Sequence, residues 1–277
     1  MARILRCGKF SLDLSRPLIM GVVNVTPDSF SDGGLVGNPA QAIEYGRTLI
    51  DEGADILDIG GESTRPGSAP VPLDEERRRI LPVIEDLSAC GVPVSVDTRK
   101  PELMREALAA GASMVNDISA LAAAGALEAV ATSSAAVCLM HMRGEPRTMQ
   151  VDPSYDDVVN EVREHLRSRV AAAQASGIAL ERIVVDPGFG FGKTLEHNLA
   201  LLRGLPALAE LGTAVLAGLS RKTMLGRLTG REVGDRVHAS VAAAVIAAGK
   251  GANIVRVHDV APTRDALAVW QAVTNRN

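Results

Sequence analysis

The chain contains eight short apolar segments, and each of them ends in polar or charged residues. Val94–Val96, for example, ends at Asp97, and Ile183–Val185 ends at Asp186. The other six segments are Leu18–Val25, Ile56–Ile59, Met114–Val115, Val137–Met140, Val215–Ala217 and Ile254–Val257. Polar groups at the carboxyl ends of successive strands are typical of the active-site face of a (β/α)₈ barrel. The pattern therefore predicts an α/β protein built as a TIM barrel.

The length of the chain agrees with one such barrel. It has 277 residues, and a single barrel typically needs about 250. No Ser/Pro-rich linker or charge run divides the sequence. We therefore expect one domain over residues 1–277, with a short hairpin at 1–16 and the barrel at 17–273.

Longer patterns of helical period separate the strands, as expected for βαβ units. We expect helices at 40–53, 73–91, 101–111, 125–133, 155–177, 195–211, 235–249 and 263–273. Asp74 is a candidate N-cap, and Pro82 predicts a kink inside the second helix. Three loops, at 26–38, 61–73 and 142–154, are longer than the usual 2–6 residues. Long loops on this face are often lids or binding loops.

Composition excludes several classes of function. The net charge is −4, so we expect no nucleic-acid surface. Cys7, Cys90 and Cys138 form no Cys-x-x-Cys pair, and we interpret them as packing residues in a reducing compartment. No secretory leader or stretch long enough to span a bilayer is visible. We therefore expect a cytoplasmic protein with no membrane partner.

The segment DPGFGFGKT at residues 186–194 looks like a phosphate-binding loop. If the segment were a Walker A motif, the first glycine of that motif would fall on Pro187. The glycine spacing of a dinucleotide-binding site is also missing. The glycines are better explained by a sharp backbone turn after Asp186.

Two complementary sets of polar residues follow the strands. Asp97, Asn116 and Asp186 are short acceptors. They suit the donor-rich edge of a flat heterocycle such as a 2-amino-4-oxo pyrimidine, because a carboxylate can accept two parallel N–H bonds. A cationic set can hold phosphates or a ring carbonyl, and a guanidinium can stack on a ring face. That set is Arg65, Lys222, Arg256 and His258.

Each of these residues also has a simpler interpretation. Asp97 could be the N-cap of the helix that follows it, and Lys222 could be a solvated lysine at a helix start. Arg256 and His258 could form a salt-bridged pair on the rim, and the three acceptors could satisfy one another. Their occurrence on one predicted face favours a site.

Two long motifs give the sequence a family resemblance. MGVVNVTPDSFSDGG at 20–34 and DIGGESTRPG at 58–67 closely resemble the signatures of dihydropteroate synthases. SVDT at 95–98, VNDI at 115–118, LMHM at 139–142, DPG at 186–188, SRK at 220–222 and RVHD at 256–259 follow in the family's order. The resemblance covers about 20–272, nearly the whole chain.

The resemblance implies a reaction between 6-hydroxymethyl-7,8-dihydropterin diphosphate and 4-aminobenzoate, with release of pyrophosphate. Asp97, Asn116 and Asp186 would hold the pterin edge, Lys222 its carbonyl, and Arg256 its face. The diphosphate would be bound by Asn24, Arg65 and His258, with Mg²⁺ as cofactor near Asn24. The aminobenzoate pocket would be formed by Phe30, Thr64, Pro66, Phe191, Ser220 and Thr223. Position 223 is often serine in the family, and threonine keeps the hydroxyl.

The family's chemistry further implies a mechanism and partners. Loss of pyrophosphate would be SN1-like, and Asp32 would face the pterin cation as the catalytic carboxylate beside Lys222, Arg256 and His258. Closure of the first two long loops would exclude water. Sulfonamides would inhibit, and the protein would be a homodimer.

Two other functions compete with this one. Methyltetrahydrofolate-corrinoid methyltransferases share the pterin pocket, but that family has Asn where this chain has Arg221 and lacks the TPDSFSD loop. A pterin-binding paralogue without activity is the second alternative, although every matched position is filled.

Overall fold

The computed structural model describes residues 4–26, 38–63 and 67–274. Eight parallel strands within these ranges close into a barrel, in the order β10-β3-β4-β5-β6-β7-β8-β9. The strands are β3 (Leu18–Asn24), β4 (Ile56–Gly60), β5 (Val94–Asp97), β6 (Met114–Asp117), β7 (Ala136–Met140), β8 (Ile183–Asp186), β9 (Ala214–Ala217) and β10 (Ile254–Val257). The predicted TIM barrel is confirmed.

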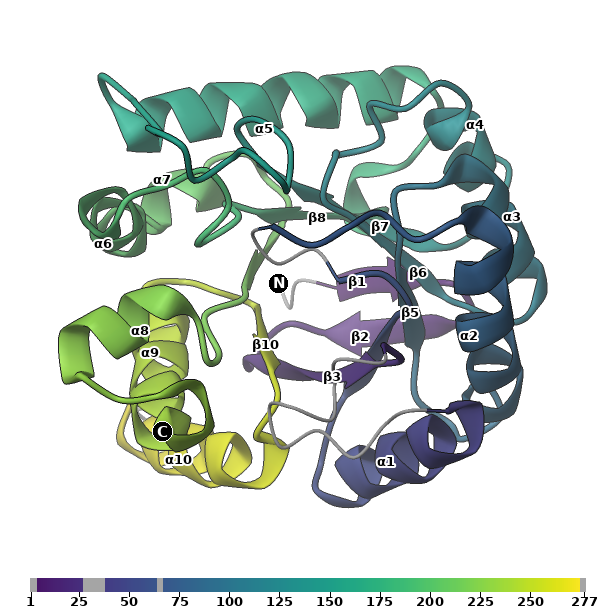
Figure 1. Ribbon diagram of the computed structural model, residues 1–277, viewed down its shortest axis with the longest axis horizontal. Helices are drawn as coiled ribbons and strands as arrows, with labels where there is room; N and C mark the ends of the chain where they lie inside the picture. Colours follow the sequence, from purple (N-terminus) through teal and green to yellow (C-terminus); the bar gives the residue numbers. More distant parts are fainter. Residues whose placement is uncertain (1–3, 27–37, 64–66, 275–277) are drawn as a thin grey trace.

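Helices surround the barrel, as Figure 1 shows. They are α1 (Pro39–Asp51), α2 (Leu73–Leu87), α3 (Pro101–Ala109), α4 (Ala126–Ala131), α5 (Val158–Ala175), α6 (Leu195–Arg203), α7 (Pro206–Ala209), α8 (Thr223–Thr229), α9 (Val237–Gly249) and α10 (Val260–Thr274). None of the helices in the described ranges is long and apolar enough to cross a membrane.

Three expectations about the helices were wrong. The N-cap of α2 is Pro72 rather than Asp74, which lies in the first turn, where a carboxylate interacts favourably with the helix dipole. The helix expected at 195–211 is divided, because α6 ends before Gly204 and α7 begins at Pro206. Helix α8 was not among the expected helices. The kink at Pro82 stays a prediction, since α2 runs through that residue.

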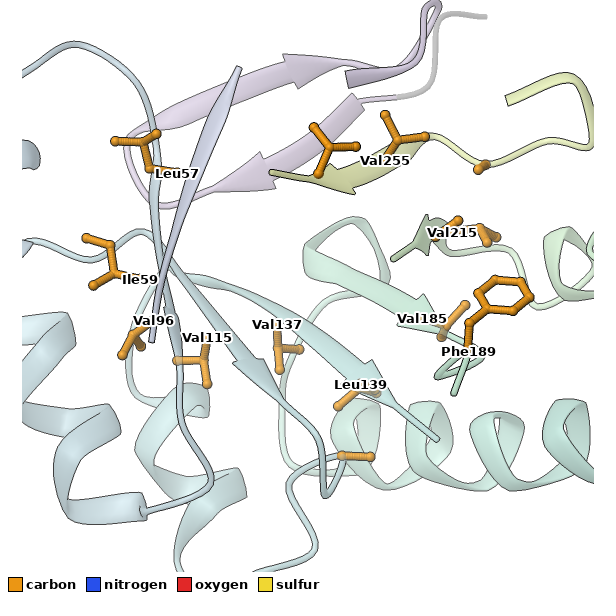
Figure 2. Packing of buried hydrophobic residues seen from close by; sticks show 14 of the residues in the cluster. Leu57, Ile59, Val96, Val115, Val137, Leu139, Val185, Phe189, Val215 and Val255 are labelled. Carbon is orange, nitrogen blue, oxygen red and sulfur yellow. The ribbon is translucent and has the colours of Figure 1, made fainter. Parts of the chain in front are cut away.

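Alternate side chains along each barrel strand belong to two different buried clusters, one between the strands and the helices and one inside the barrel. On β4, Leu57 and Ile59 face the surrounding helices, whereas Ile56 belongs to a second cluster inside the barrel. Figure 2 shows the outer layer, in which the outward side chains of successive strands lie in a row. Successive strand residues point to opposite faces of a sheet, so every second residue of each barrel strand points inward.

The hairpin of β1 (Ile4–Cys7) and β2 (Phe10–Asp13) lies at the end of the barrel where the strands begin. Leu5 and Cys7 belong to the same buried cluster as the inward side chains. Cys7 donates from Sγ to the carbonyl oxygen of Ser113 at 3.2 Å. Burial raises the pKa of its thiol to about 12. The thiol therefore stays protonated and serves packing, as predicted, and the other end of the barrel is left for the site.

Candidate functional site

The inward positions at the carboxyl ends of the strands carry the predicted site residues. Register places Asp97 of β5 directly beside Asn116 of β6. Asp186 ends β8, and Arg256 follows the inward-facing Ile254 by two residues on β10. A period of two therefore directs all four side chains into the mouth of the barrel.

Arg256 reaches across the mouth to two other strands. Its Nε donates to Oδ2 of Asp58 at 2.6 Å, and its Nη2 donates to Oδ2 of Asp97 at 3.0 Å. The simpler interpretation that paired Arg256 with His258 is therefore wrong. Asp97 is not the N-cap of α3 either, since Lys100 occupies that position.

Asp58 is a site residue that the sequence analysis did not assign. Its side chain is fully buried on β4, and Oδ2 also accepts from Nδ2 of Asn116 at 3.0 Å. A single carboxylate thus fixes both the arginine and the asparagine of the site. The available signal was a carboxylate inside the apolar run Ile56–Ile59, because aspartate is almost never fully buried unless it is paired.

Two buried acceptors of this group have no hydrogen-bond partner among the residues that the structure describes. They are Oδ1 of Asp58 and Oδ1 of Asn116. An unpaired buried acceptor costs about 1–3 kcal/mol, and native proteins keep few of them. Acceptors of this kind at a barrel mouth favour a ligand that offers N–H donors. The interpretation that Asp97, Asn116 and Asp186 mainly satisfy one another has no support, since their contacts are with Arg256, Asp58 and Gly188.

The electrostatics of the group are dominated by burial. Burial, together with the nearby charge of Asp58, raises the pKa of Asp97 to about 8, although Arg256 acts in the opposite direction. Burial also raises the pKa of Asp186, against the charge of Lys222. A ligand that donates to these carboxyl groups would favour their charged forms.

Lys222 and Asp186 meet Arg256 around Gly218. A β-carbon at Gly218 would lie 3.8 Å from Cβ of Arg256, and 3.9 Å from both Oδ2 of Asp186 and Nζ of Lys222. Lys222 also donates to the carbonyl oxygen of Phe189. Burial lowers the pKa of Lys222 to about 8, with Asp186 opposing the shift. The interpretation of Lys222 as a solvated lysine is therefore wrong.

Phe191 also contacts Lys222. The ammonium group of Lys222 lies 4.7 Å from the centroid of the Phe191 ring. Gly188, in the same turn, has a φ of +66°, and a β-carbon there would lie 1.9 Å from the carbonyl oxygen of His141. The sharp turn predicted after Asp186 is confirmed, and only glycine fits it.

His258 and Ser220 form the neighbouring part of the site. Oγ of Ser220 lies 3.0 Å from Nδ1 of His258 and accepts from its backbone N–H at 3.2 Å. Arg221, between Ser220 and Lys222, instead pairs with Asp259 through Nη2 and Oδ1 at 2.7 Å. That pair ties the loop after β9 to the loop after β10, so it holds Ser220 and His258 together. Thr223 follows as the exposed first residue of α8.

The remaining predicted residues are less fully described. Phe30, Asp32, Thr64, Arg65 and Pro66 lie outside the described ranges. Asn24 ends β3 and is half-buried.

For a metal, Asn24 is the candidate ligand. The described ranges contain no group of three or more His, Cys, Asp or Glu residues that could hold a metal ion. Mg²⁺ commonly binds through one or two protein oxygens together with phosphates and waters. One amide oxygen at the barrel mouth fits a Mg²⁺ ion that arrives with a diphosphate, and it does not fit a metal held by protein alone.

Comparison with known proteins agrees with this geometry. Residues 20–258 match the family described as pterin binding enzyme. The dihydropteroate synthase of Neisseria meningitidis serogroup B is 52% identical over 281 residues, which cover 99% of each chain. The structure of Xanthomonas albilineans dihydropteroate synthase with 4-aminobenzoic acid is 55% identical over 100% of both chains, with a TM-score of 0.93. The Yersinia pestis dihydropteroate synthase with a sulfonamide drug complex is 46% identical over 98% of both chains, with a TM-score of 0.94.

Proposed function

This chain belongs to the pterin-binding enzyme family and catalyses the dihydropteroate synthase reaction of folate biosynthesis, and we propose how its barrel mouth does so. In that reaction the aniline nitrogen of 4-aminobenzoate replaces the diphosphate of 6-hydroxymethyl-7,8-dihydropterin diphosphate. Asp97, Asn116 and Asp186 accept hydrogen bonds from the amino group and ring N–H groups of the pterin. Lys222 donates to the ring carbonyl.

The unpaired buried acceptors of Asp58 and Asn116 are the observation that carries this assignment. A 2-amino-4-oxo pyrimidine ring offers several N–H donors on one edge and a carbonyl beside them. The ring carbonyl needs a donor, and Lys222 can supply it. Its ammonium group and the carboxyl group of Asp186 both lie close to Gly218, because a β-carbon there would be 3.9 Å from each. Donor and acceptor chemistry of the site and of the pterin are therefore complementary.

Arg256 is assigned to the face of the pterin. Asp58 and Asp97 hold its guanidinium from two sides, which fixes the plane of the group. A planar guanidinium in a fixed orientation can stack on an aromatic ring. The leaving diphosphate is assigned to Arg65 and His258 instead.

Asn24 is the proposed protein ligand of Mg²⁺. When bound, Mg²⁺ would neutralise charge on the diphosphate. Ser220 orients the imidazole of His258 through Nδ1, and His258 with Arg65 binds the diphosphate oxygens. Removal of divalent cations should abolish turnover, and added Mg²⁺ should restore it.

The chemical step we propose is SN1-like. The C–O bond to pyrophosphate breaks first, because an electron-rich dihydropterin can stabilise positive charge on its exocyclic methylene. Fixed cations near the leaving group lower the barrier without reorganisation. Asp32, assigned on the family's motif, would stabilise the cation. The aniline nitrogen then attacks the methylene and loses a proton.

The aminobenzoate pocket is assigned to residues that surround the pterin site. Phe191 lies against Lys222, and Ser220 precedes Lys222 by two residues in the segment after β9, which supports assigning both to a ring beside the pterin. Phe30, Thr64, Pro66 and Thr223 are assigned on the family's motifs. Sulfonamides, which mimic aminobenzoate, should compete for the same pocket.

We also propose a homodimer in the cytoplasm. Val269 and Val273 on α10 and Ile246 on α9 are large apolar residues that are at least half exposed. Helices α9 and α10 pack side by side, so they could present a common apolar face to a second copy. Sedimentation of the purified protein at micromolar concentration should give the mass of two chains.

The decisive experiment follows pyrophosphate and dihydropteroate together, in the presence of Mg²⁺. Pyrophosphate release matched by dihydropteroate, and dependent on aminobenzoate for product, is the expected result. Asp186→Ala serves as the control that should bind pterin more weakly than the unmodified protein. Pterin binding without either product would favour the inactive paralogue. Methyl transfer from methyltetrahydrofolate would favour the corrinoid methyltransferase.

A further inference from the structure

Lys193 is a buried lysine that the proposed mechanism does not use. It belongs to the glycine-rich segment at 186–194, in which the proposed function assigns substrate contacts to Asp186 and Phe191. Its side chain is 3% exposed. Such burial is unusual for lysine, which is almost never fully buried unless it is paired.

The contacts of Lys193 are with the backbone of its own turn and with His141. Nζ donates to the carbonyl oxygens of Gly188 and Phe191, both at 2.9 Å. It also lies 3.0 Å from Nδ1 of His141. Burial and the nearby charge of Lys193 lower the pKa of His141 to about 2. The imidazole is therefore neutral at physiological pH, and Nδ1 can accept a hydrogen bond from Lys193.

Lys193 is one of several groups that hold the glycine-rich turn. The N–H of Gly190 donates to Oδ1 of Asn198 at 2.7 Å, and the N–H of Phe191 donates to the carbonyl oxygen of Gly188 at 3.1 Å. Gly188, Gly190 and Gly192 all have positive φ, at +66°, +81° and +64°. Glycine in such positions carries a large conformational entropy that folding must overcome. A β-carbon at Gly192 would lie 2.3 Å from the carbonyl oxygen of Arg143, so the turn lies close against the neighbouring backbone. The two hydrogen bonds from Lys193 join the first and fourth residues of the turn through one side chain, so they contribute to holding its shape.

The same turn contacts the pterin site at three points. Gly188 donates its N–H to Oδ1 of Asp186 at 2.7 Å. Phe189 accepts from Lys222 through its carbonyl oxygen, and the ring of Phe191 lies under the ammonium group of Lys222. A displacement of the turn would therefore move the donor that we assign to the pterin carbonyl.

We propose that Lys193 is a positioning residue for pterin binding, which holds the 188–192 turn so that Phe189 and Phe191 orient Lys222. This inference rests on the proposed role of Lys222. Lys193 touches no substrate in this assignment and acts only through the turn.

A double-mutant cycle tests the inference, with the dissociation constant of dihydropterin diphosphate as the measurement. Lys193→Met should weaken binding about tenfold, the effect of one displaced hydrogen bond. In a Lys222→Met background the same change should weaken binding less than about threefold, because the residue that Lys193 positions is then missing. Lys250→Met, at an exposed lysine next to the end of α9, is the matched control and should bind as the unmodified protein does.

Each outcome of the cycle decides something different. Equal losses in both backgrounds would overturn the inference, because Lys193 would then act independently of Lys222. Unchanged affinity in folded Lys193→Met, with only a lower melting temperature, would show that Lys193 serves stability alone. If Lys222→Met binds pterin normally, the assigned role of Lys222 is wrong, and this inference fails with it.

Tyr155→Phe provides a second variant in case Lys193→Met does not fold. The hydroxyl of Tyr155 donates to the carbonyl oxygen of Gly192 at 2.9 Å, so its removal loosens the same turn by one bond. We expect about a threefold loss of pterin affinity that disappears in the Lys222→Met background. Unchanged affinity in Tyr155→Phe would contradict transmission through the turn.

Discussion

Replacement of Lys222 by methionine should make the ligand-free protein more stable and the enzyme inactive. Lys222 is half-buried at the barrel mouth, and its ammonium group has lost part of its hydration. Methionine is a flexible apolar side chain of similar length, so it should fill the same space without a charge. Stabilisation accompanied by loss of function is expected where an active site contains a group whose burial lowers the free energy of unfolding.

The pKa of Lys222 gives the size of the effect. Burial lowers this pKa from 10.5 to about 8, and each pKa unit corresponds to about 1.4 kcal/mol. The charged form at neutral pH therefore costs up to about 3–4 kcal/mol of unfolding free energy, and partial exposure reduces this to about 2–3 kcal/mol. Methionine also loses the hydrogen bond to Phe189, worth about 1 kcal/mol. We expect a net stabilisation of about 1–2 kcal/mol, or roughly 2–6 °C in a chain of this size.

The pH dependence gives a sharper test. The pKa of Lys222 is lower in the folded than in the unfolded protein, so its cost is absent above pH 10.5 and grows as the pH falls to about 8. Below about pH 8 the cost is constant. The stability difference between Lys222→Met and the unmodified protein should therefore be large at about pH 7 and smaller at about pH 10.

Urea unfolding of both proteins at the two pH values measures this difference, with Lys250→Met as a surface control. Pterin affinity, measured in parallel, should fall about 10- to 100-fold, since a buried ring carbonyl loses its donor. A Lys222→Met protein that is less stable than the unmodified one at neutral pH would refute the reasoning. A difference that does not change with pH would refute it as well.

Four further predictions concern the carboxylates of the site. Asp186→Ala leaves pterin N–H donors unpaired and should cost about 1–3 kcal/mol of pterin binding; unchanged affinity in calorimetry would contradict the pterin assignment. Pterin binding should release a proton from Asp97 near neutral pH, because its pKa is raised to about 8 in the ligand-free site and the bound donors favour the carboxylate. The binding enthalpy should then differ between phosphate and Tris buffers, and equal enthalpies would count against it. Asp58→Asn leaves Arg256 with Asp97 as its one carboxylate partner in the described part of the site. The change should lower the unfolding free energy by about 2–3 kcal/mol, somewhat less than the full loss of a buried pair. Urea unfolding measures this, and an unchanged midpoint would contradict the prediction. Asp32→Ala should lower kcat more than pterin affinity, since the cation exists only near the transition state; equal losses in steady-state and binding measurements would remove Asp32 from that role.

Local features of the sequence were enough to predict much of the site. Asp97, Asn116 and Asp186 end apolar runs, and alternation along a strand decides that all three face inward. The glycines after Asp186 predicted a sharp turn because positive φ is a property of single residues. Helix boundaries were less well predicted where two signals compete, as at Asp74, or where Gly204 and Pro206 interrupt an apolar pattern.

The partners of the same residues could not be predicted locally. Asp58 and Arg256 are 198 positions apart in the chain, and only closure of the barrel, in which β10 pairs with β3, brings β10 close to β4. Lys193 was visible in its motif, but its burial against His141 depends on how the turn lies on the loop after β7. The lowered pKa of Lys222 likewise follows from packing around it.

The sequence by itself therefore determined the barrel, the face on which chemistry occurs and the family to which the chain belongs. These follow from the alternation of side chains along strands, the residue preferences of turns and long sequence motifs, all of which depend on residues close together in the sequence. The tertiary structure alone decided that Asp58 fixes Arg256 and Asn116, that Lys222 is desolvated, and that Lys193 supports the turn beside it. Those features depend on distances across the barrel and on exclusion of water, which no local pattern contains.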